Sequence, residues 1–462
     1  MASNSRKNVF LLRSPVDMPP EQAWELFTRH STHVRLQPPW IPCHHESFHR
    51  SAFEGAQSLS HEKGDPILKG RWLKRIESMR KGYLIVEKAI KSPMREWSHW
   101  RQFLPGEETY ACVIEDRIEY RPPFFHLPRF HKRVERQLLD RFRYQYRTLQ
   151  DDLAVVQRWN PRPRRILIAG GTGLIGSALR SYLQTWGHQV SILSRTSSPA
   201  HLPWDPVNGI LPVSSLEAHD IIINLAGTSI ARRWTRKTRA QIRDSRLMAT
   251  HLLAREIARL KYPPELFIQI SGIGYYGTQT TAHADENAGK GDGFLADLCE
   301  EWEQAARNAI PFVERFVCLR PGVVLSPLGG ALAKMLPLFR TGLGGPIGEG
   351  SQLMSWISLD DLLRSFTFII GNAGVSGTLN ATAPEPTTNS AFTHALASAL
   401  SRPAIVKAPA RAMKLAYGAM ASETLLASQS VVPTRLLEKG FVFAHPDIKS
   451  AIQALLPENT KV

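Results

Sequence analysis

The sequence predicts an α/β protein, in which a doubly wound parallel sheet is followed by a helical module and preceded by an α+β domain. From residue 165 onward, short apolar stretches alternate with helical segments at the spacing of β-α-β units. After about residue 383 the sequence turns helical, and before residue 158 several strand-like stretches precede one long amphipathic helix. The length of 462 residues is enough for two or three domains.

The N-terminal part predicts an antiparallel sheet closed by a helix. The expected strands cover residues 9–12, 82–90, 95–104 and 110–120, and a short helix is expected over 19–27. A long helix is expected over 129–153, because one stripe of it is apolar: Val134, Leu138, Phe142, Tyr146 and Leu149. A curved sheet packed against this last helix is the natural arrangement of that order.

Two breaks in the sequence set the expected domain boundaries. The stretch from Trp159 to Arg165 contains two prolines, which favour an extended connection. A second break, Ala-Pro-Glu-Pro, begins at Ala383. The expected domains are therefore residues 1–158, 165–382 and 383–462.

The middle domain shows the alternation of a parallel sheet. Its expected strands cover residues 166–169, 189–193, 220–224, 266–271 and 316–320. Its expected helices lie between the first two strands and over residues 235–260 and 293–308. Strands separated by helices in this way indicate right-handed β-α-β crossovers.

A glycine-rich turn follows the first of these strands: Gly170, Gly171, Thr172, Gly173, Leu174, Ile175 and Gly176. Gly170 permits a tight turn, Gly173 lets a pyrophosphate approach the backbone, and Gly176 lets the next helix pack closely on the strand. The helix N-terminus presents free N–H groups to an anion. The segment predicts a Rossmann-type dinucleotide-binding domain; a glycine turn without a ligand is the alternative.

The end of the second strand indicates which dinucleotide is preferred. NAD-specific sites usually place a carboxylate there, whereas this chain has Ser194 and Arg195. A guanidinium suits a 2′-phosphate, so NADP(H) is expected rather than NAD(H). The alternative is that Arg195 stacks on the adenine or faces solvent.

From these residues onward the chain resembles the extended short-chain dehydrogenase/reductase superfamily. Asn224, Leu225, Ala226 and Gly227 look like the segment that closes over the cofactor, and Leu319-Arg320-Pro321-Gly322 looks like the strand and loop beside the nicotinamide. The resemblance places Ser271 and Pro321 at the cofactor as well. The resemblance covers residues 165–382. It implies a small-molecule substrate of unknown identity, or a protein that binds the cofactor without a substrate.

Several shorter motifs are similar to one atypical branch of that superfamily, known simply as epimerase family proteins. They are Trp204-Asp205-Pro206, Gly274-Tyr275-Tyr276-Gly277, residues 294–303 and residues 432–443. Some members of the branch carry a cell-division-inhibitor label. Related epimerases often pair through helices like the one expected over 235–260, so the resemblance leaves a homodimer open.

The N-terminal part resembles a helix-grip domain of the START/polyketide-cyclase type, which some members of the branch carry. The resemblance rests on Pro38-Pro39-Trp40, Gly70-Arg71-Trp72 and Trp97-Ser98-His99-Trp100. It implies a cavity for an apolar ligand between sheet and helix. The alternative is that these aromatic residues only fill a core.

The usual catalytic set of the superfamily is not evident. Its members use a Tyr whose pKa is lowered by a Lys four residues later, together with a Ser. No tyrosine of this chain has Lys at that spacing. Alignment to the superfamily pattern puts Phe294, Leu298 and Gly272 at the Tyr, Lys and Ser positions.

Substitute groups are available for the acid/base role. Tyr275 and Tyr276 follow the strand that should end near the nicotinamide, so either phenol is a candidate acid/base group and Tyr276 is the preferred one. A core or stacking role is the alternative. Other candidates are the pair Asp285 and Glu286, the thiol of Cys299, and a clamp formed by Arg243 and Arg246.

Composition excludes several classes. The four cysteines, Cys43, Cys112, Cys299 and Cys318, form no metal-ligand spacing, so no metal is expected. Without a membrane-length apolar run or a secretion signal, a cytoplasmic location is expected. The net charge of +16 is diffuse, so nucleic-acid binding is not expected.

The sequence thus predicts an NADP(H)-binding epimerase/oxidoreductase-like protein. The alternatives are a non-catalytic NADP(H)-dependent sensor, and a protein that binds an apolar ligand through its N-terminal domain.

Overall fold

The computed structural model describes residues 7–63, 67–106, 111–123, 128–159, 161–196, 201–280 and 283–457. It divides into two units. One comprises Met1–Ala154 with Gln184–Trp186, and the other comprises Val155–Leu183 with Gly187–Val462. The expected linker lies at the start of the second unit, and its Asn160 falls outside the described residues.

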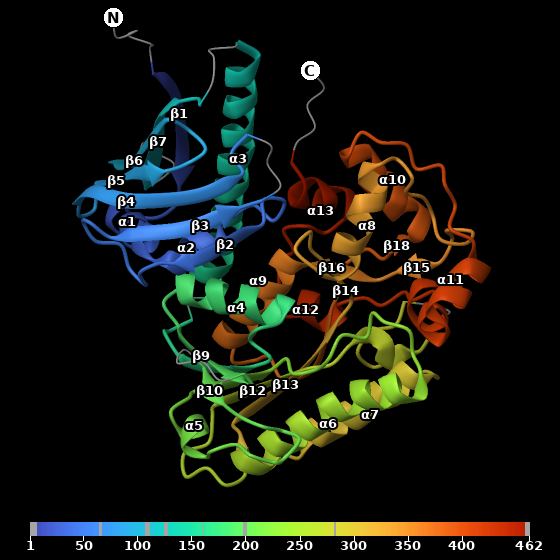
Figure 1. Ribbon diagram of the computed structural model, residues 1–462. Helices are drawn as coiled ribbons and strands as arrows, with labels where there is room; N and C mark the ends of the chain where they lie inside the picture. Colours follow the sequence, from blue (N-terminus) through green and yellow to red (C-terminus); the bar gives the residue numbers. More distant parts are fainter. Residues whose placement is uncertain are drawn as a thin grey trace, which may run out of the picture. The chain divides into compact units, whose positions relative to one another are not determined.

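The first unit is built on one antiparallel sheet of seven strands, in the order β1-β7-β6-β5-β4-β3-β2. The strands are β1 (Asn8–Val16), β2 (Cys43–Ser47), β3 (Gln57–Glu62), β4 (Gly70–Arg80), β5 (Leu84–Lys91), β6 (Glu96–Pro105) and β7 (Cys112–Arg121). Two short helices, α1 (Pro20–Thr28) and α2 (His30–Arg35), follow β1. The long helix α3 (Pro128–Trp159) packs against the sheet (Figure 1).

The predicted apolar stripe of α3 is confirmed, since all five of its residues are buried in the core shared with the sheet. The predicted strands near β1, β5, β6 and β7 are present, but β2, β3, β4 and α2 were not predicted. Strands β2 and β3 read CHHES and QSLSHE, with almost no alternation of apolar and polar residues. Hydrophobic periodicity cannot reveal strands whose inner face is itself polar.

The second unit contains the doubly wound parallel sheet that the sequence predicts. Its strand order is β10-β9-β8-β11-β12-β13-β17, and every neighbouring pair is parallel. The strands are β8 (Arg165–Ala169), β9 (Gln189–Ser194), β10 (Leu202–Pro203), β11 (Ile221–Asn224), β12 (Leu266–Ile270), β13 (Arg315–Pro321) and β17 (Gly377–Ala381). The order reverses at β8, so the carboxyl ends of β8 and β11 form the switch point at which such sheets bind ligands.

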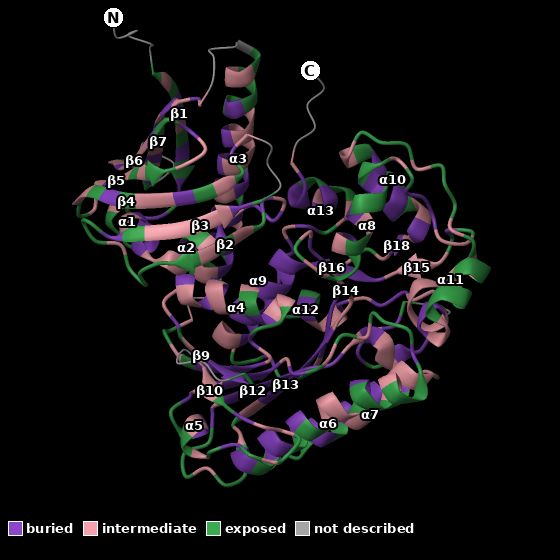
Figure 2. Ribbon diagram, in the orientation of Figure 1, coloured by how far each residue is buried: buried purple, intermediate pink, exposed green. Residues whose placement is uncertain are grey.

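Helices cover both faces of this sheet (Figure 1). Helices α6 (Arg236–Ile257) and α7 (Phe294–Arg307) lie on one face, where Leu253 and Ala306 join the core residues of the strands. Helices α4 (Leu174–Thr185) and α9 (Leu359–Gly371) lie on the other, joined by a hydrogen bond of 3.0 Å from Thr367 Oγ1 to the Tyr182 hydroxyl. Figure 2 shows the strands between them as largely buried, which explains why their sequences are mainly apolar.

The C-terminal part of the second unit is mainly helical, as expected. Its elements are α10 (Asn389–Ala399), α11 (Ala410–Tyr417), a π-helical turn (Ala421–Leu425), α12 (Thr434–Glu438) and α13 (Ile448–Leu455). Helices α10 and α13 pack with α8 (Gly330–Arg340) in one apolar cluster. Two small sheets, β14 (Val323–Leu325) with β16 (Trp356–Ser358) and β15 (Leu353–Met354) with β18 (Thr387–Thr388), complete this part. None of the helices in the described ranges is both long and apolar enough to cross a membrane.

Candidate functional site

The glycine-rich turn joins β8 to α4 in a conformation that requires glycine. Gly170 has φ +82°, and a Cβ there would lie 2.7 Å from the carbonyl carbon of Leu225. At Gly176 a Cβ would lie 2.6 Å from the Gly171 Cα and closer still to the Gly170 oxygen. Gly173 differs, because its only close neighbour would be the Gly170 oxygen at 3.4 Å. The turn is thus tight against its own backbone, while Gly173 leaves room for a ligand.

The segment after β11 lies against this turn because β8 and β11 are neighbours. The Leu225 amide donates to the Ala169 carbonyl at 2.8 Å. Asn224 is fully buried; its amide nitrogen donates to Thr250 Oγ1 and Gln269 Oε1, and its Oδ1 accepts from the Ala226 amide. Asn224 therefore supports this segment from within the protein, and both N–H groups of its side chain are already used.

The residues after β9 present a free cation. Ser194 is buried, and its hydroxyl accepts a hydrogen bond from the Thr196 amide at 3.1 Å. Arg195 is exposed and makes no ion pair or hydrogen bond with any residue in the described part of the chain, although its charge contributes to lowering the pKa of the Asp205 carboxyl. Its guanidinium is available to an anion at the end of β9.

A buried ion pair lies where β12 and β13 end. Arg320 donates to both carboxylate oxygens of Glu303, from Nε and Nη2, each at 2.7 Å. Burial opposes the positive charge, but Glu303 and Tyr276 hold the pKa of Arg320 above its ordinary value. The Ser271 hydroxyl donates to the same carboxylate at 2.8 Å. Ser271 is thus committed to Glu303.

The two tyrosines predicted as acid/base candidates have different surroundings. The Tyr276 hydroxyl donates to Asn380 Oδ1 at 2.9 Å and accepts from Arg320 Nη1 at 2.9 Å, and burial raises its pKa. The Tyr275 ring lies 3.5 Å from the Arg320 guanidinium, is half-buried, and its hydroxyl bonds to no described residue. Of the two phenols, only that of Tyr275 has a hydroxyl proton that is not donated in a hydrogen bond to a described residue.

The segment that carries these tyrosines is fastened by the C-terminal part of the same unit. Gln429 Nε2 donates to the carbonyls of Gly277 and Ile273. Asn380, the acceptor of Tyr276, donates through its own amide to the Val432 carbonyl at 3.0 Å. Residues 429–432 therefore form the outer support of this segment.

Helix α7 presents apolar groups at the two aligned positions. Phe294 packs its ring on Trp234 with centroids 5.1 Å apart, and Leu298 is buried in the same apolar cluster. Cys299 is buried as well, and burial raises the pKa of its thiol to about 11. A thiol that stays protonated at neutral pH is not a nucleophile.

The other candidates are excluded by their contacts. Asp285 accepts from the Asn287 amide in a turn, and Glu286 accepts from the backbone amides of Asn380 and Arg435. The predicted clamp is wrong, because Arg243 is exposed and pairs with Glu301 at 2.7 Å. Arg246 instead lies over Trp302, 5.0 Å from the ring centroid, with its guanidinium against Gly227.

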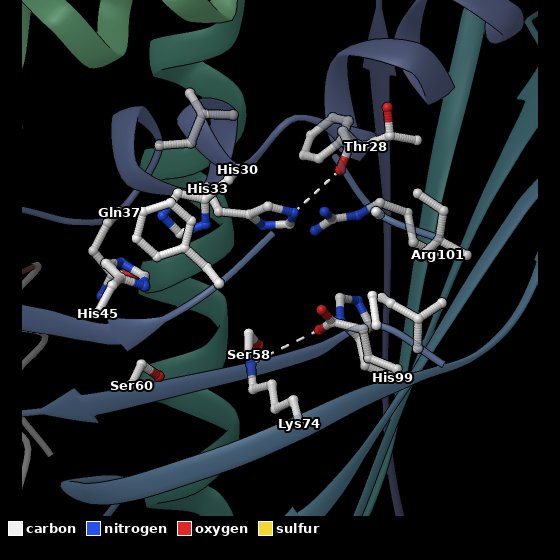
Figure 3. A pocket seen from close by; sticks show the side chains of 18 of the residues that line it. Thr28, His30, His33, Gln37, His45, Ser58, Ser60, Lys74, His99 and Arg101 are labelled. Carbon is white, nitrogen blue, oxygen red and sulfur yellow. Dashed lines mark hydrogen bonds and ion pairs between the residues drawn. The ribbon is translucent and has the colours of Figure 1, made fainter. Parts of the chain in front are cut away.

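The N-terminal unit holds a cavity of about 170 Å³ between sheet and helices (Figure 3). Imidazole and charged side chains line it, among them His30, His33, His45, Lys74 and Arg101. The sequence predicted a cavity for an apolar ligand, and the lining combines these polar groups with apolar side chains such as Ile85 and Phe142. The sequence motifs behind that expectation were aromatic, and Trp72 and Trp97 are buried in the core.

Sequence reasoning did not assign roles to Arg320, Glu303 and Asn380, which organise the end of the sheet. Each is a polar residue in a segment that otherwise reads as a buried strand or a buried helix face. A polar residue in such a segment needs a partner, and this was the available signal.

Comparison with known proteins agrees with a dinucleotide-binding fold in this part of the chain. The model of the NAD dependent epimerase/dehydratase family matches residues 166–381, and a domain of unknown function matches residues 408–455. An epimerase family protein from Mycobacterium bovis is 42% identical over 291 residues, which are 62% of this chain and 96% of that protein.

Two crystal structures extend the likeness. Human epimerase family protein SDR39U1 with NADPH is 36% identical, with a TM-score of 0.58 over 63% of this chain and 98% of its own. A nucleoside-diphosphate sugar epimerase from Corynebacterium glutamicum is 28% identical, with a TM-score of 0.77 over 97% of this chain and 91% of its own. The chain therefore belongs to the NAD-dependent epimerase/dehydratase family, within the group of epimerase family proteins that includes SDR39U1.

Proposed function

We propose that residues 165–382 bind NADP(H), and that the protein is an epimerase/oxidoreductase-like member of its family that lacks the usual Ser, Tyr and Lys set. The observation that carries this proposal is the glycine turn at the switch point, packed on Leu225 and open at Gly173. The human relative crystallised with NADPH supports the same cofactor.

The residues present fit a dinucleotide. The backbone of Gly170–Gly176, with the first turn of α4, would hold the pyrophosphate, because the first amides of a helix have no partner within the helix. Leu225, Ala226 and Gly227 would line the other side, with Pro321 and Ser271 near the nicotinamide end. Arg195 would take the 2′-phosphate, since its guanidinium is exposed and no described residue forms a direct ion pair or hydrogen bond with it. When bound, the cofactor supplies hydride transfer at its nicotinamide ring.

Tyr275 is the proposed proton donor for such a transfer. It would protonate the oxygen of a substrate carbonyl whose carbon receives the hydride. Tyr276 is better suited to position Tyr275, because its own proton goes to Asn380 and Arg320 links both phenols. A Tyr275→Phe variant should lose turnover and keep cofactor affinity.

A second candidate function is a non-catalytic sensor in which NADP(H) occupancy changes how a partner binds. The apolar packing of Phe294 and Leu298 favours it, because no lysine is then available to lower the pKa of a phenol. Sustained oxidation of NADPH with a defined substrate would exclude this candidate.

Calorimetric titration with NADPH and with NADH tests the cofactor proposal. Arg195→Ala should weaken NADPH binding at least about tenfold and leave NADH binding unchanged, because only NADPH has the 2′-phosphate. Arg243→Ala is the matched control, as another exposed arginine with a partner of its own. Equal loss of both nucleotides in Arg195→Ala, or no binding of either to the unaltered protein, would refute the assignment.

We further propose that residues 1–158 form a helix-grip domain of the START/polyketide-cyclase type, followed by a cofactor domain at 165–382 and a C-terminal module at 383–462. A single antiparallel sheet that carries one long final helix and encloses a cavity supports the first part. The match of a separate family model to residues 408–455 supports the last.

A further inference from the structure

Some polar groups that line the cavity of the N-terminal unit keep hydrogen-bonding positions that no described residue occupies. The Glu87 carboxylate is 3.8 Å from Lys74 Nζ and 4.0 Å from His99 Nδ1, and neither distance is a hydrogen bond. Because Lys74 and the nearby basic side chains outweigh the effect of burial, the pKa of Glu87 falls to about 2. An ionised carboxylate thus faces the cavity with its acceptor positions open.

A second open acceptor lies across the cavity. The Phe27 carbonyl can only accept, so the 3.1 Å contact with His33 Nε2 places the ring proton on that nitrogen. Burial lowers the pKa of His33 to about 4, so the ring is neutral at physiological pH and Nδ1 carries a lone pair. Although protein surrounds the His33 ring, much of its surface remains accessible, because it faces the cavity.

Donors alternate with these acceptors. Figure 3 shows Arg101 and His33 pointing toward each other across the cavity, with Lys74 on a third side. Arg101 is held in place by its Nε, which donates to the fully buried Asp116 at 2.7 Å. Asp116 also accepts from His99 and from the Tyr146 hydroxyl, which fixes the orientation of this wall.

The charges of the lining are balanced. Each of its four cations has a carboxylate of its own: Lys74 with Glu87, Arg75 with Glu77, Arg101 with Asp116, and Arg141 with Glu62. The lining imidazoles of His30 and His45 are also shifted toward the neutral form by burial. A charged ligand would therefore enter an enclosed space without a free counter-charge, which is unfavourable.

An apolar ligand is disfavoured for the opposite reason. It would cover Glu87, His33 Nδ1 and Lys74 and would offer them no hydrogen bond. The apolar part of the lining, which includes Phe27, Ile85 and Phe142, offers a surface for packing but no partner for these polar groups. The volume of about 170 Å³ is close to that of cavities that accept one six-membered ring.

From these observations we infer that the N-terminal unit is a second ligand site, which binds a small, net-uncharged molecule carrying several hydroxyl groups on one ring. Hydroxyls both donate and accept, so such a molecule satisfies Glu87 and His33 as well as Arg101 and Lys74. The C–H face of the ring packs on the apolar wall.

Three probes of equal ring size test this inference by ligand-observed NMR on the full-length protein. They are glucose, glucose 6-phosphate and cyclohexanol, which share the size and differ in charge or in hydrogen-bonding capacity. Glucose should bind at least ten times more tightly than either of the others. Tighter binding of cyclohexanol or glucose 6-phosphate, or no saturation by glucose at its highest usable concentration, overturns the inference.

Variants locate the site. Glu87→Gln and His33→Leu should each weaken glucose binding at least fivefold, whereas Glu96→Gln, which alters an exposed ion pair outside the cavity, should have no effect. Near-UV circular dichroism establishes that each variant is folded, and Glu87→Gln keeps the shape of the side chain in case His33→Leu does not fold. Unchanged glucose affinity in both folded cavity variants would also overturn the inference.

Discussion

Two single-methyl substitutions in the glycine turn should separate folding from cofactor binding. In Gly176→Ala the new methyl would lie 2.6 Å from the Gly171 Cα and nearer to the Gly170 oxygen, and both are backbone atoms that cannot move independently. Carbon atoms in contact normally sit about 3.5–4.0 Å apart, so α4 and the turn residues Gly170 and Gly171 must separate by about 1 Å. Overpacking of this kind costs about 1–3 kcal/mol.

Gly173→Ala should behave differently. Its methyl would meet only the Gly170 oxygen, at an ordinary distance of 3.4 Å, so stability should change by less than about 0.5 kcal/mol. The methyl would, however, occupy the space proposed for the pyrophosphate. The expected result is a protein of unchanged stability that no longer binds NADPH.

Differential scanning fluorimetry with and without NADPH measures both effects. At about 2–4 °C per kcal/mol, Gly176→Ala should lower the Tm by about 2–12 °C, and Gly173→Ala should leave the Tm unchanged and abolish its rise with NADPH. A Gly176→Ala protein with an unchanged Tm would refute the packing argument. A Gly173→Ala protein that binds NADPH normally would refute the placement of the pyrophosphate.

Three further predictions follow from buried groups. Arg320→Met should destabilise the protein by about 3–5 kcal/mol, because Glu303 then keeps a buried unpaired charge. Adding Glu303→Leu should recover most of this loss, as urea denaturation of the single and double variants would show. A double variant as unstable as Arg320→Met would contradict the prediction. The N-terminal unit should lose stability as the pH falls from 6.5 to about 3, because His30 (folded pKa about 3) and His33 (about 4) take up protons in the unfolded chain at pH values where the folded unit does not. Urea titrations at pH 7, 5 and 4 should show the free energy of unfolding falling with pH. The fall should be smaller in His33→Gln. Iodoacetamide at pH 8 should leave Cys299 unmodified in the folded protein and alkylate it in urea, as peptide mass spectrometry would show. Rapid alkylation of the folded protein would mean that the thiol is neither buried nor protonated.

The parallel sheet could be predicted because its local signals agree. Strands such as β11 and β12 are buried on both faces and therefore read as continuous apolar runs, and the glycines of the turn mark where β8 ends. The same reasoning located α3, whose apolar stripe faces one core. Strands β2 and β3 were missed because a polar cavity replaces the core on their inner side, which removes the alternation that identifies a half-buried strand.

The site could be predicted only in its backbone features. Glycines in the local sequence predict a turn, but the partners of a buried side chain depend on the tertiary fold. The sequence favoured Tyr276 as the acid/base group, whereas in the fold its hydroxyl is bound by Arg320 and by Asn380, which lies more than a hundred residues later in the chain. Arg243 and Arg246, three positions apart on one helix, were predicted to form a clamp together. In the fold the Arg246 guanidinium instead lies against Gly227.

The support that residues 429–432 give to the tyrosine segment affects how the chain matures during synthesis. The sheet from β8 to β13 is complete once residue 321 has left the ribosome, and the glycine turn can close on Leu225 from then on. Gln429 and Val432 are made more than a hundred residues after residue 321, so Gly277 and Asn380 have no contact with these partners until residues 429–432 have been synthesised. A nascent chain, or one cut by a protease before Gln429, would thus carry a formed cofactor turn beside an unfastened tyrosine segment. The emergence of residues 429–432 is the step that completes this site.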